Sequence, residues 1–311
     1  MPLPSKKAED TPGQPSTGLV KIKQMRTLIG QMEQQIKAAV PKYLDPSRFV
    51  RVVLTLYNQN YKLHQCSDIS FLAAVMTAAQ LGLEPDGILG EGYIIPYGNR
   101  AQFQTGYKGL LKLARNAGNI KDVQLEVVYA KDKFTYKKGL EPILDHEPSE
   151  DVDPGPITHV YMIVRFLNGG FQYKVMTRAQ IERHRDRYSK AYAWDLKNIE
   201  KTMNGKLTRE KAIEELTLAQ KLSPWFTNEE AMFKKTVAIQ CCKLLDLSPE
   251  ARKQIAREEH LEQGLDLPVD LSSVNDDVIE STAEDVKPDK PAGELTAPPS
   301  RSDELAERIS K

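Results

Sequence analysis

The stretch LEPDGILGEGYIIPYGNRAQFQTGYKGLLKLARNAG, residues 83–118, carries the strongest structural signals in the chain. Its runs 93–97 and 101–105 flank Gly98-Asn99-Arg100, which predicts a β-hairpin. Pro96 has no amide hydrogen and therefore confines its strand to a sheet edge or a bulge. Apolar residues then recur with helical spacing over 107–117, and Gly118-Asn119 predicts the end of that helix. The stretch therefore predicts two paired strands followed directly by a helix.

Helical patterns precede this stretch, and both strands and helices follow it. Upstream, helices are expected over 27–39, from 46 onward and over 68–81. Downstream, strands are expected at 123–129 and 134–136, a loop at 141–156, and a hairpin of 158–166 with 171–176. Capping boxes at Thr177–Gln180 and Thr227–Glu230 predict helices to about residue 192 and to residue 245, with a short helix from Thr208 between them. Because βαβ units do not alternate, an α+β fold is favoured, with a small antiparallel sheet and hairpins packed with flanking helices.

Composition divides the chain into three parts. Residues 1–26 are predicted to be a disordered leader, because prolines and polar residues dominate its beginning. Residues 27–250 hold the periodic patterns and are expected to form the folded core. Residues 251–311 are acidic and, from 264 onward, lack aromatic residues, so they are predicted to be a mostly disordered tail.

The formal net charge is zero, but the charge is unevenly distributed. Residues 1–250 hold 35 basic and 28 acidic residues, whereas residues 251–311 hold 8 and 15. Zero net charge argues against nucleic-acid binding, whereas a basic body joined to an acidic tail leaves it open. Three cysteines, two of them adjacent, indicate no disulfide framework. With neither a signal peptide nor an apolar run of about 20 residues, the chain is predicted to be cytoplasmic.

Catalytic and cofactor motifs are weak in this sequence. It contains neither a P-loop nor a strand followed by G-x-G-x-x-G, and its five histidines lack metal-ligand spacing, so no cofactor is expected. Pro85-Asp86 followed by Glu91 resembles the start of a metal-dependent nuclease site, although Tyr93 stands where such sites carry lysine. A nuclease-like enzyme of DNA metabolism is therefore one alternative. A DNA-free scaffold whose acidic tail docks a partner is another.

A basic stripe next to aromatic residues is the first binding signal. The helix predicted over 107–117 carries Lys108, Lys112 and Arg115 at i, i+4 and i+7, opposite an apolar face. Polar and aromatic residues lie in the hairpin region just before it and at its first position: Tyr97, Asn99, Arg100, Phe103 and Tyr107. Rings that stack on bases, beside cations that contact phosphates, hold single strands without sequence preference. The alternative is an amphipathic surface helix beside a core hairpin.

A second basic stripe strengthens the binding interpretation. Arg183, Arg187 and Lys190 repeat the same spacing in the helix that follows Thr177. Lys174 and Arg178 lie nearby, and Lys234-Lys235 form a third, weaker cluster. Two separate basic stripes in a chain of zero net charge favour a groove that binds a polyanion. The affinity of the protein for such a ligand is expected to fall steeply as the salt concentration rises.

Several motifs in order resemble a known family. QLGLEPDGILGEGYIIPYGN and GYKGLLKLARNAG are followed by PITHVYMIVRFLNGGFQYKVMTRAQIE and then by SPWFTNEEAMFKKT. These segments look like the signature of the RecT family, the phage and prophage single-strand annealing proteins. The resemblance covers about residues 30–250, and the order of its motifs makes it specific.

The resemblance implies an annealing protein that is not an enzyme. Complementary strands are expected to pair without ATP in homologous recombination, with single-stranded DNA and the annealed duplex intermediate as ligands. Residues 27–250 become the DNA-binding, annealing and oligomerisation core, which assembles into a homo-oligomeric ring or helical filament. A partner exonuclease is implied, and the acidic tail, residues 251–311, is a candidate docking segment for a host single-strand-binding protein.

Binding roles carry over to individual positions, with two departures. Tyr107, Lys108 and Arg115 match the family's G-Y-[KR]-G…L-A-R motif, while Arg178 has either a binding or a helix-capping role. An arginine pair often follows K-K-T in the family, but it is absent after Thr236. Any DNA contact that this pair makes in relatives is therefore not expected here. The charged stretch 195–222 is longer than in relatives, and it is either an arm for subunit contact or a surface insertion.

Overall fold

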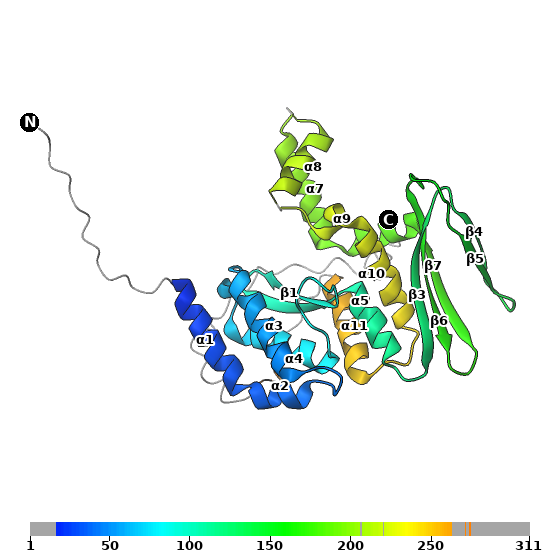
Figure 1. Cartoon of the computed structure of the whole chain (residues 1–311). Helices are drawn as coiled ribbons and strands as arrows, with labels where there is room; N and C mark the ends of the chain where they lie inside the picture. The colour runs from blue at the N-terminus through cyan, green and yellow to red at the C-terminus, as the bar shows by residue number, and fades with distance from the viewer. Residues whose placement is uncertain (1–16, 206, 220, 263–270, 272–273, 275–311) are drawn as a thin grey trace, which may run out of the picture.

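The computed structural model describes residues 17–205, 207–219 and 221–262, together with residues 271 and 274 (Figure 1). The predicted disorder of residues 1–16 and of most of the tail lies outside these described residues. Helices and small antiparallel sheets make up the described chain, so the α+β prediction is confirmed. None of the described helices is long and apolar enough to cross a membrane.

Four helices and a short 3-10 turn form the N-terminal part. They are α1 (Thr17–Gln31), α2 (Glu33–Ala39), α3 (Pro46–Gln59), η1 (Leu63–Gln65) and α4 (Asp68–Leu81). Nearly every residue of α4 is buried, as its uniformly apolar sequence predicts, and Gly82 ends the helix with a left-handed backbone at φ 64°. The leader boundary is wrong for residues 17–26, because they belong to α1, where Met25 is fully buried in the core.

The predicted hairpin and helix are both present. Strands β1 (Gly92–Tyr97) and β2 (Arg100–Thr105) pair antiparallel from Gly92↔Thr105 to Tyr97↔Arg100, which leaves a two-residue turn at 98–99. Gly98 has φ 59° in this turn, a conformation that glycine adopts at little cost. Helix α5 (Tyr107–Arg115) follows after Gly106, and β2 packs on α4.

Glycines let the chain before β1 lie against α5. A Cβ added at Gly109, within α5, would stand 2.0 Å from the carbonyl oxygen of Glu91, and one at Gly106 would stand 2.0 Å from that of Gly90. No side chain fits at such distances, so loop 83–91 and α5 are joined directly through their backbones. Gly106 also donates its N–H to the Glu91 carbonyl at 2.9 Å.

Gly109→Ala is expected to lower the free energy of unfolding by about 3 kcal/mol, because the added methyl group forces the loop backbone away from α5. Gly30→Ala is the matched control, since Gly30 lies in α1 with no atom within 4 Å of an added Cβ. Its change is expected to be neutral or stabilising by up to about 1 kcal/mol, from helix propensity alone. Urea unfolding followed by circular dichroism measures both, and equal midpoints would contradict the close contact.

A three-stranded antiparallel sheet with the order β3-β6-β7 forms the second half of the fold. Its strands are β3 (Ile120–Tyr129), β6 (Ile157–Phe166) and β7 (Phe171–Thr177), which confirms the strand and hairpin predictions. One face packs against α10 and α5, and Val160, Met162 and Val164 of β6 are fully buried there. The other face forms a small separate cluster around Val128, Tyr161 and Val175.

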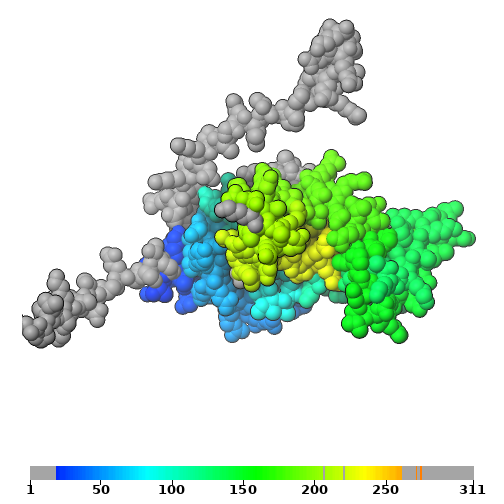
Figure 2. Space-filling model, turned by 90° about the horizontal axis from the view of Figure 1, so that it is seen from above, coloured from blue at the N-terminus to red at the C-terminus, as the bar shows by residue number. Residues whose placement is uncertain are grey.

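A third hairpin covers this small cluster. Strands β4 (Lys133–Lys137) and β5 (Ile143–Glu147) pair antiparallel and form one edge of the molecule (Figures 1 and 2). The prediction that 141–156 is only a loop is therefore wrong for 143–147. Leu144 and His146 alternate with exposed Ile143, Asp145 and Glu147, so the acidic residues that indicated a loop are the outward-facing half of a strand.

Helices α6 to α11 make up the rest of the secondary structure in the described residues. They are α6 (Arg178–Tyr188), α7 (Lys190–Met203), α8 (Arg209–Leu218), α9 (Pro224–Thr227), α10 (Glu229–Cys242) and α11 (Pro249–Glu262). The Thr177–Gln180 capping box is confirmed, but the helix it starts ends at Tyr188, because Ser189 caps a new helix there. Asn228, not Thr227, accepts the capping hydrogen bond of α10. Helices α7 and α8 project from the body as an arm (Figure 1).

The tail boundary at residue 251 is also wrong. Helix α11 extends to Glu262 and packs on α4, with Ala251 and Ile255 buried in the main core. The carboxylate of Glu258 accepts the N–H of Thr105 in β2 at 2.6 Å and lies 3.0 Å from Nζ of Lys235 in α10. Leu271 and Val274 pack against the same core. The start of the acidic segment is therefore an integral part of the fold.

Candidate nucleic-acid interface

The outer face of α5 lines a shallow cleft with loop 83–91. The cleft has a volume of about 440 Å³, and Lys108, Lys112 and Arg115 all line it. The opposite face of α5 buries Leu110, Leu113 and Ala114, so the predicted amphipathic helix is confirmed. Lys108 and Arg115 are exposed, and within the described chain neither has a carboxylate within ion-pair distance. These two cations are the available part of the stripe.

Lys112 occupies the same stripe but is already engaged. Its Nζ lies 2.7 Å and 2.9 Å from the two carboxylate oxygens of Glu91, and 5.4 Å from the ring centroid of Tyr43. Glu91 therefore offsets the charge of Lys112 and holds its side chain in place at the cleft. The predicted set of three equivalent cations is in fact two exposed cations around one paired cation.

Tyr107 and Lys234 meet at the start of α5. Nζ of Lys234 lies 5.9 Å from the ring centroid of Tyr107 and 2.6 Å from Oε1 of Glu230. Burial alone lowers the pKa of Lys234, but the hydrogen bond and the charge of Glu230 outweigh it and raise the pKa above its usual value. Lys234 is thus a firmly protonated cation beside an aromatic ring, which brings two predicted residues from distant parts of the sequence together.

The hairpin residues separate into surface and core. Tyr97 is 46% exposed and its hydroxyl accepts a hydrogen bond from Nε2 of Gln104 at 2.7 Å. Asn99 lies exposed in the turn, and Arg100 is half-buried. Phe103 is only 5% exposed because it faces the core beneath Gly92, so the prediction that its ring stacks on bases is wrong.

The second stripe is present on α6 and at the start of α7. Arg183, Arg187 and Lys190 are exposed, and the guanidinium of Arg187 lies 5.1 Å from the ring centroid of Tyr188. Arg185 points inward instead, 3.9 Å from the ring centroid of Tyr192. Helix α10 packs against both α5 and α6, so it separates the two basic stripes.

Two other predicted cations, Arg178 and Lys235, pair with carboxylates within the fold, and a third, Lys174, is half-buried. Arg178 bonds Glu182 at 2.9 Å and Glu229 at 2.6 Å, which ties α6 to α10. Lys235 is largely buried against Glu258, as described above. Lys174 is half-buried on β7, where its charge opposes the burial that raises the pKa of Cys241 to about 11. The ion pairs of Arg178 and Lys235 explain these two cations without a DNA strand.

The carboxylates of the nuclease alternative are also engaged elsewhere. Oδ1 of Asp86 accepts the N–H groups of Ile88 and Leu89, both at 2.9 Å, and so caps a turn. Glu91 pairs with Lys112. Within the described part of the chain, no group of three or more His, Cys, Asp or Glu side chains is placed to hold a metal ion.

The sequence patterns did not indicate three residues that lie at clefts in the structure. Tyr43, in the turn after α2, contacts Lys112 and is 54% exposed. Lys253 and Arg257 of α11 line a second cleft beside α4. Their i, i+4 spacing was a detectable signal, but it lay in the segment assigned to the tail.

Comparison with known proteins places the chain in a family. A sequence profile described as the RecT family matches residues 47–268, and the chain belongs to the RecT family. It is 31% identical over 268 residues to Protein RecT of Escherichia coli (strain K12), covering 83% of this chain and 88% of that protein. It is also 31% identical over 150 residues to Uncharacterized protein YqaK of Bacillus subtilis (strain 168), covering 48% of this chain and 52% of YqaK. The family resemblance read from the motifs is confirmed.

Proposed function

We propose that this chain binds single-stranded DNA on the face of α5 and anneals complementary strands without ATP. The observation that carries the proposal is the pair of exposed cations, Lys108 and Arg115, on one cleft next to the Tyr107–Lys234 contact. Cations that contact phosphates leave the pairing edges of the bases open to a second strand. Because duplex formation is itself favourable, no nucleotide hydrolysis is required.

A homo-oligomeric ring or filament is part of this proposal. Two exposed cations in a shallow cleft provide weak binding to one subunit, whereas many aligned copies bind one strand by multivalency. The projecting α7–α8 arm is a candidate for contact between subunits. Trp194 and Leu218, which are exposed large apolar residues on α7 and α8, support that role.

Two complementary oligonucleotides, each carrying one dye of an energy-transfer pair, test the function. Energy transfer is expected to rise faster with protein than without it, in buffer that contains neither nucleotide nor divalent cation. A denaturing gel after incubation with Mg²⁺ is expected to show strands of unchanged length. Annealing at the protein-free rate would overturn the proposal, and shortened strands would favour the nuclease alternative.

Residues 281–311 are expected to bind partner proteins and not to be needed for annealing itself. A chain that ends at residue 280 keeps α11 and the packed residues Leu271 and Val274. It is expected to anneal naked oligonucleotides at the rate of the full chain but to lose the capture of a host single-strand-binding protein or a partner exonuclease. Pull-down of these two partners by both chain lengths measures the difference, and lost annealing by the shortened chain would contradict it.

A further inference from the structure

Helix α7 of the arm carries an exposed tryptophan in line with two lysines. Trp194 is 59% exposed, and Lys197 and Lys201 are also exposed. The three residues stand at i, i+3 and i+7, so they form one row along a single face of α7, which we call the α7 stripe. Tryptophan is mostly buried in folded proteins. An indole that is more than half exposed, on an arm that projects from the body (Figure 1), therefore indicates a binding surface.

The buried side of α7 fixes the direction of the α7 stripe. Ile199 is buried against α8. Asp195 is 2% exposed, and its carboxylate accepts the N–H of Ser223 at 2.9 Å. Because a helix turns about 100° per residue, the α7 stripe cannot join this buried side. The packing of the arm therefore holds the tryptophan and the two lysines outward.

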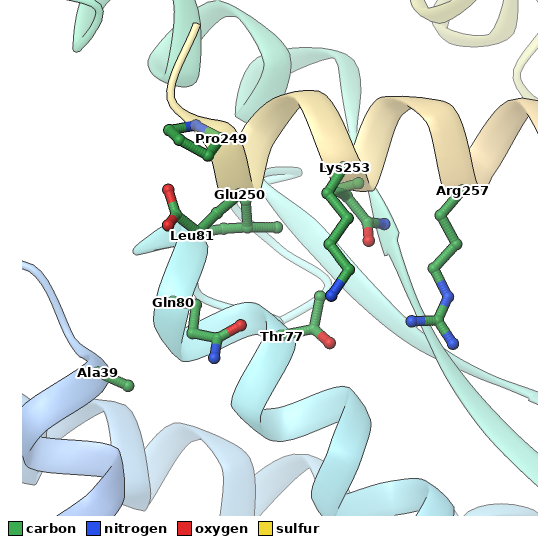
Figure 3. A pocket seen from close by; sticks show the side chains of 9 residues that line it. Ala39, Thr77, Gln80, Leu81, Pro249, Glu250, Lys253 and Arg257 are labelled. Atoms are coloured by element: carbon green, nitrogen blue, oxygen red, sulfur yellow. The ribbon is translucent and has the colours of Figure 1, made fainter. Parts of the chain in front are cut away.

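The two lysines of the α7 stripe have charge available for a ligand. Within the described residues, neither Lys197 nor Lys201 pairs with a carboxylate, and this includes Glu200, the exposed carboxylate of α7. The cleft between α4 and α11 differs, because its cations Lys253 and Arg257 already interact with other groups of the fold (Figure 3). Two lysines at i and i+4 repel each other, and an anionic ligand relieves that repulsion.

A single-stranded nucleic acid fits both parts of the α7 stripe. It offers phosphates to the lysines and unpaired bases to the indole ring. The Cα atoms of Lys197 and Lys201 lie about 6 Å apart along the helix axis, which is close to the spacing of successive phosphates in a strand. A duplex keeps its base faces stacked on one another, so it offers none to Trp194. An acidic peptide would pair with the lysines but would leave the indole without a flat partner.

The α7 stripe continues the second basic stripe of Arg183, Arg187 and Lys190. Lys190 begins α7 and stands one turn before Trp194 on the same face of that helix. It already has a partner within the fold, so its charge is not counted as available. Helix α10 packs against both α5 and α6. The extended stripe is therefore separate from the α5 cleft.

We propose that the α7 stripe is a second site for single-stranded DNA. One base stacks on Trp194, and backbone phosphates contact Lys197 and Lys201. This inference rests on the proposed function, since it assigns part of the arm to the same ligand. One subunit then has two separate places for single strands, which are the two reactants of annealing. Leu218 on α8 is left for contact between subunits.

Intrinsic fluorescence tests the stacked base directly. The chain has two tryptophans, and Trp225 is only 7% exposed, so a quencher in solution reaches mainly Trp194. Oligothymidylate is expected to quench the fluorescence of the parent and to shield it from acrylamide. Trp194→Phe is expected to lose nearly all of this response.

Anisotropy measures how much the indole contributes to affinity. The background is Lys108→Ala/Arg115→Ala, which removes the contacts on α5. In that background, Trp194→Ala is expected to weaken the remaining binding of oligothymidylate by roughly five- to a hundredfold, the loss of one stacked base. Trp194→Phe keeps a ring and is expected to keep most of the affinity.

The double variant Lys197→Gln/Lys201→Gln tests the two cations. Quenching titrations at several salt concentrations are expected to give a slope of log affinity against log salt that is smaller by about 1.4, which corresponds to two phosphate contacts. Arg209→Gln/Lys211→Gln is the matched control, because it removes two exposed charges from α8 of the same arm. Its slope is expected to equal that of the parent. Melting temperatures equal to that of the parent exclude unfolding as the cause.

The outcomes separate this inference from the proposed function. If Lys108→Ala/Arg115→Ala weakens binding while oligothymidylate leaves the tryptophan fluorescence unchanged and the two double variants of the arm behave alike, the inference is wrong and the proposed function stands. If the parent shows no quenching and Trp194→Ala changes the size of the DNA-free assembly in sedimentation, Trp194 is a contact between subunits and the inference is again wrong. If the parent binds no oligonucleotide at low salt, both are wrong.

Discussion

Lys108→Ala/Arg115→Ala is expected to weaken binding of single-stranded DNA by at least about tenfold at moderate salt and to slow annealing in parallel. Both side chains are exposed and, within the described residues, make no ion pair. Arg115 donates from Nη2 to the carbonyl oxygen of Val123 at 3.4 Å, which is a long hydrogen bond, so removing the two side chains is expected to cost the fold little. If each contacts one phosphate, the slope of log affinity against log salt falls by about 1.4. Anisotropy titrations at several salt concentrations measure both the affinity and the slope.

Lys137→Ala/Lys138→Ala is the matched control for this pair. It removes the same number of positive charges, but from exposed positions at the end of β4 and the turn after it, away from α5. Long-range attraction falls slightly in both variants, whereas the loss of phosphate contacts is confined to the α5 pair. An equal loss of affinity in the two variants would show that general charge, and not the α5 cleft, holds the strand.

Glu258→Ala is expected to lower the free energy of unfolding by about 3–5 kcal/mol. The side chains of Glu258 and Lys235 are 5% and 14% exposed, and Nζ and Oε2 lie 3.0 Å apart. Removing the carboxylate leaves the buried ammonium without this partner, and it also takes the acceptor from the N–H of Thr105. The variant is therefore expected to loosen α11 from β2 and α10. Urea unfolding followed by circular dichroism gives the change.

Glu259→Ala, one residue further along α11, is the control. Glu259 pairs with Lys243 at 2.6 Å, but 38% of its side chain and 26% of that of Lys243 are exposed. Solvent screens such a pair, so its loss is expected to cost less than about 1 kcal/mol. Similar losses in the two variants would mean that α11 contributes only through helix formation and not through the Glu258 contacts.

Local patterns in the sequence were sufficient for most elements. The β1–β2 hairpin and α5 follow from a tight turn and a change from strand to helical spacing within 25 residues, between Tyr93 and Ala117. The β6–β7 hairpin follows from a similar turn, and α6 from its capping box. Each of these signals acts over a few residues, so no distant contact is needed to read it. Strand β5 was not predicted, because its acidic residues indicated a loop although exposed and half-buried positions alternate along it.

The candidate site was less predictable, because a charge pattern does not reveal which cations have partners. Lys108 and Lys112 are one turn apart on the same stripe, yet Lys112 pairs with Glu91 from a loop that precedes the hairpin. Arg178 likewise pairs with Glu229, 51 residues later. Phe103 alternates correctly in β2, but its side of the strand faces the core. These outcomes depend on contacts between segments far apart in the chain.

The sequence by itself determined the α+β class, the hairpins, the amphipathic α5 and membership in the RecT family, because each rests on local spacing or on motif order. Only the tertiary structure decided where the folded core ends and which cations are exposed. Helix α11 belongs to the core through buried contacts with β2 and α10, although its composition resembles a solvated tail. Burial and ion pairing are properties of packed segments, and they depend on neighbours that the local sequence does not contain.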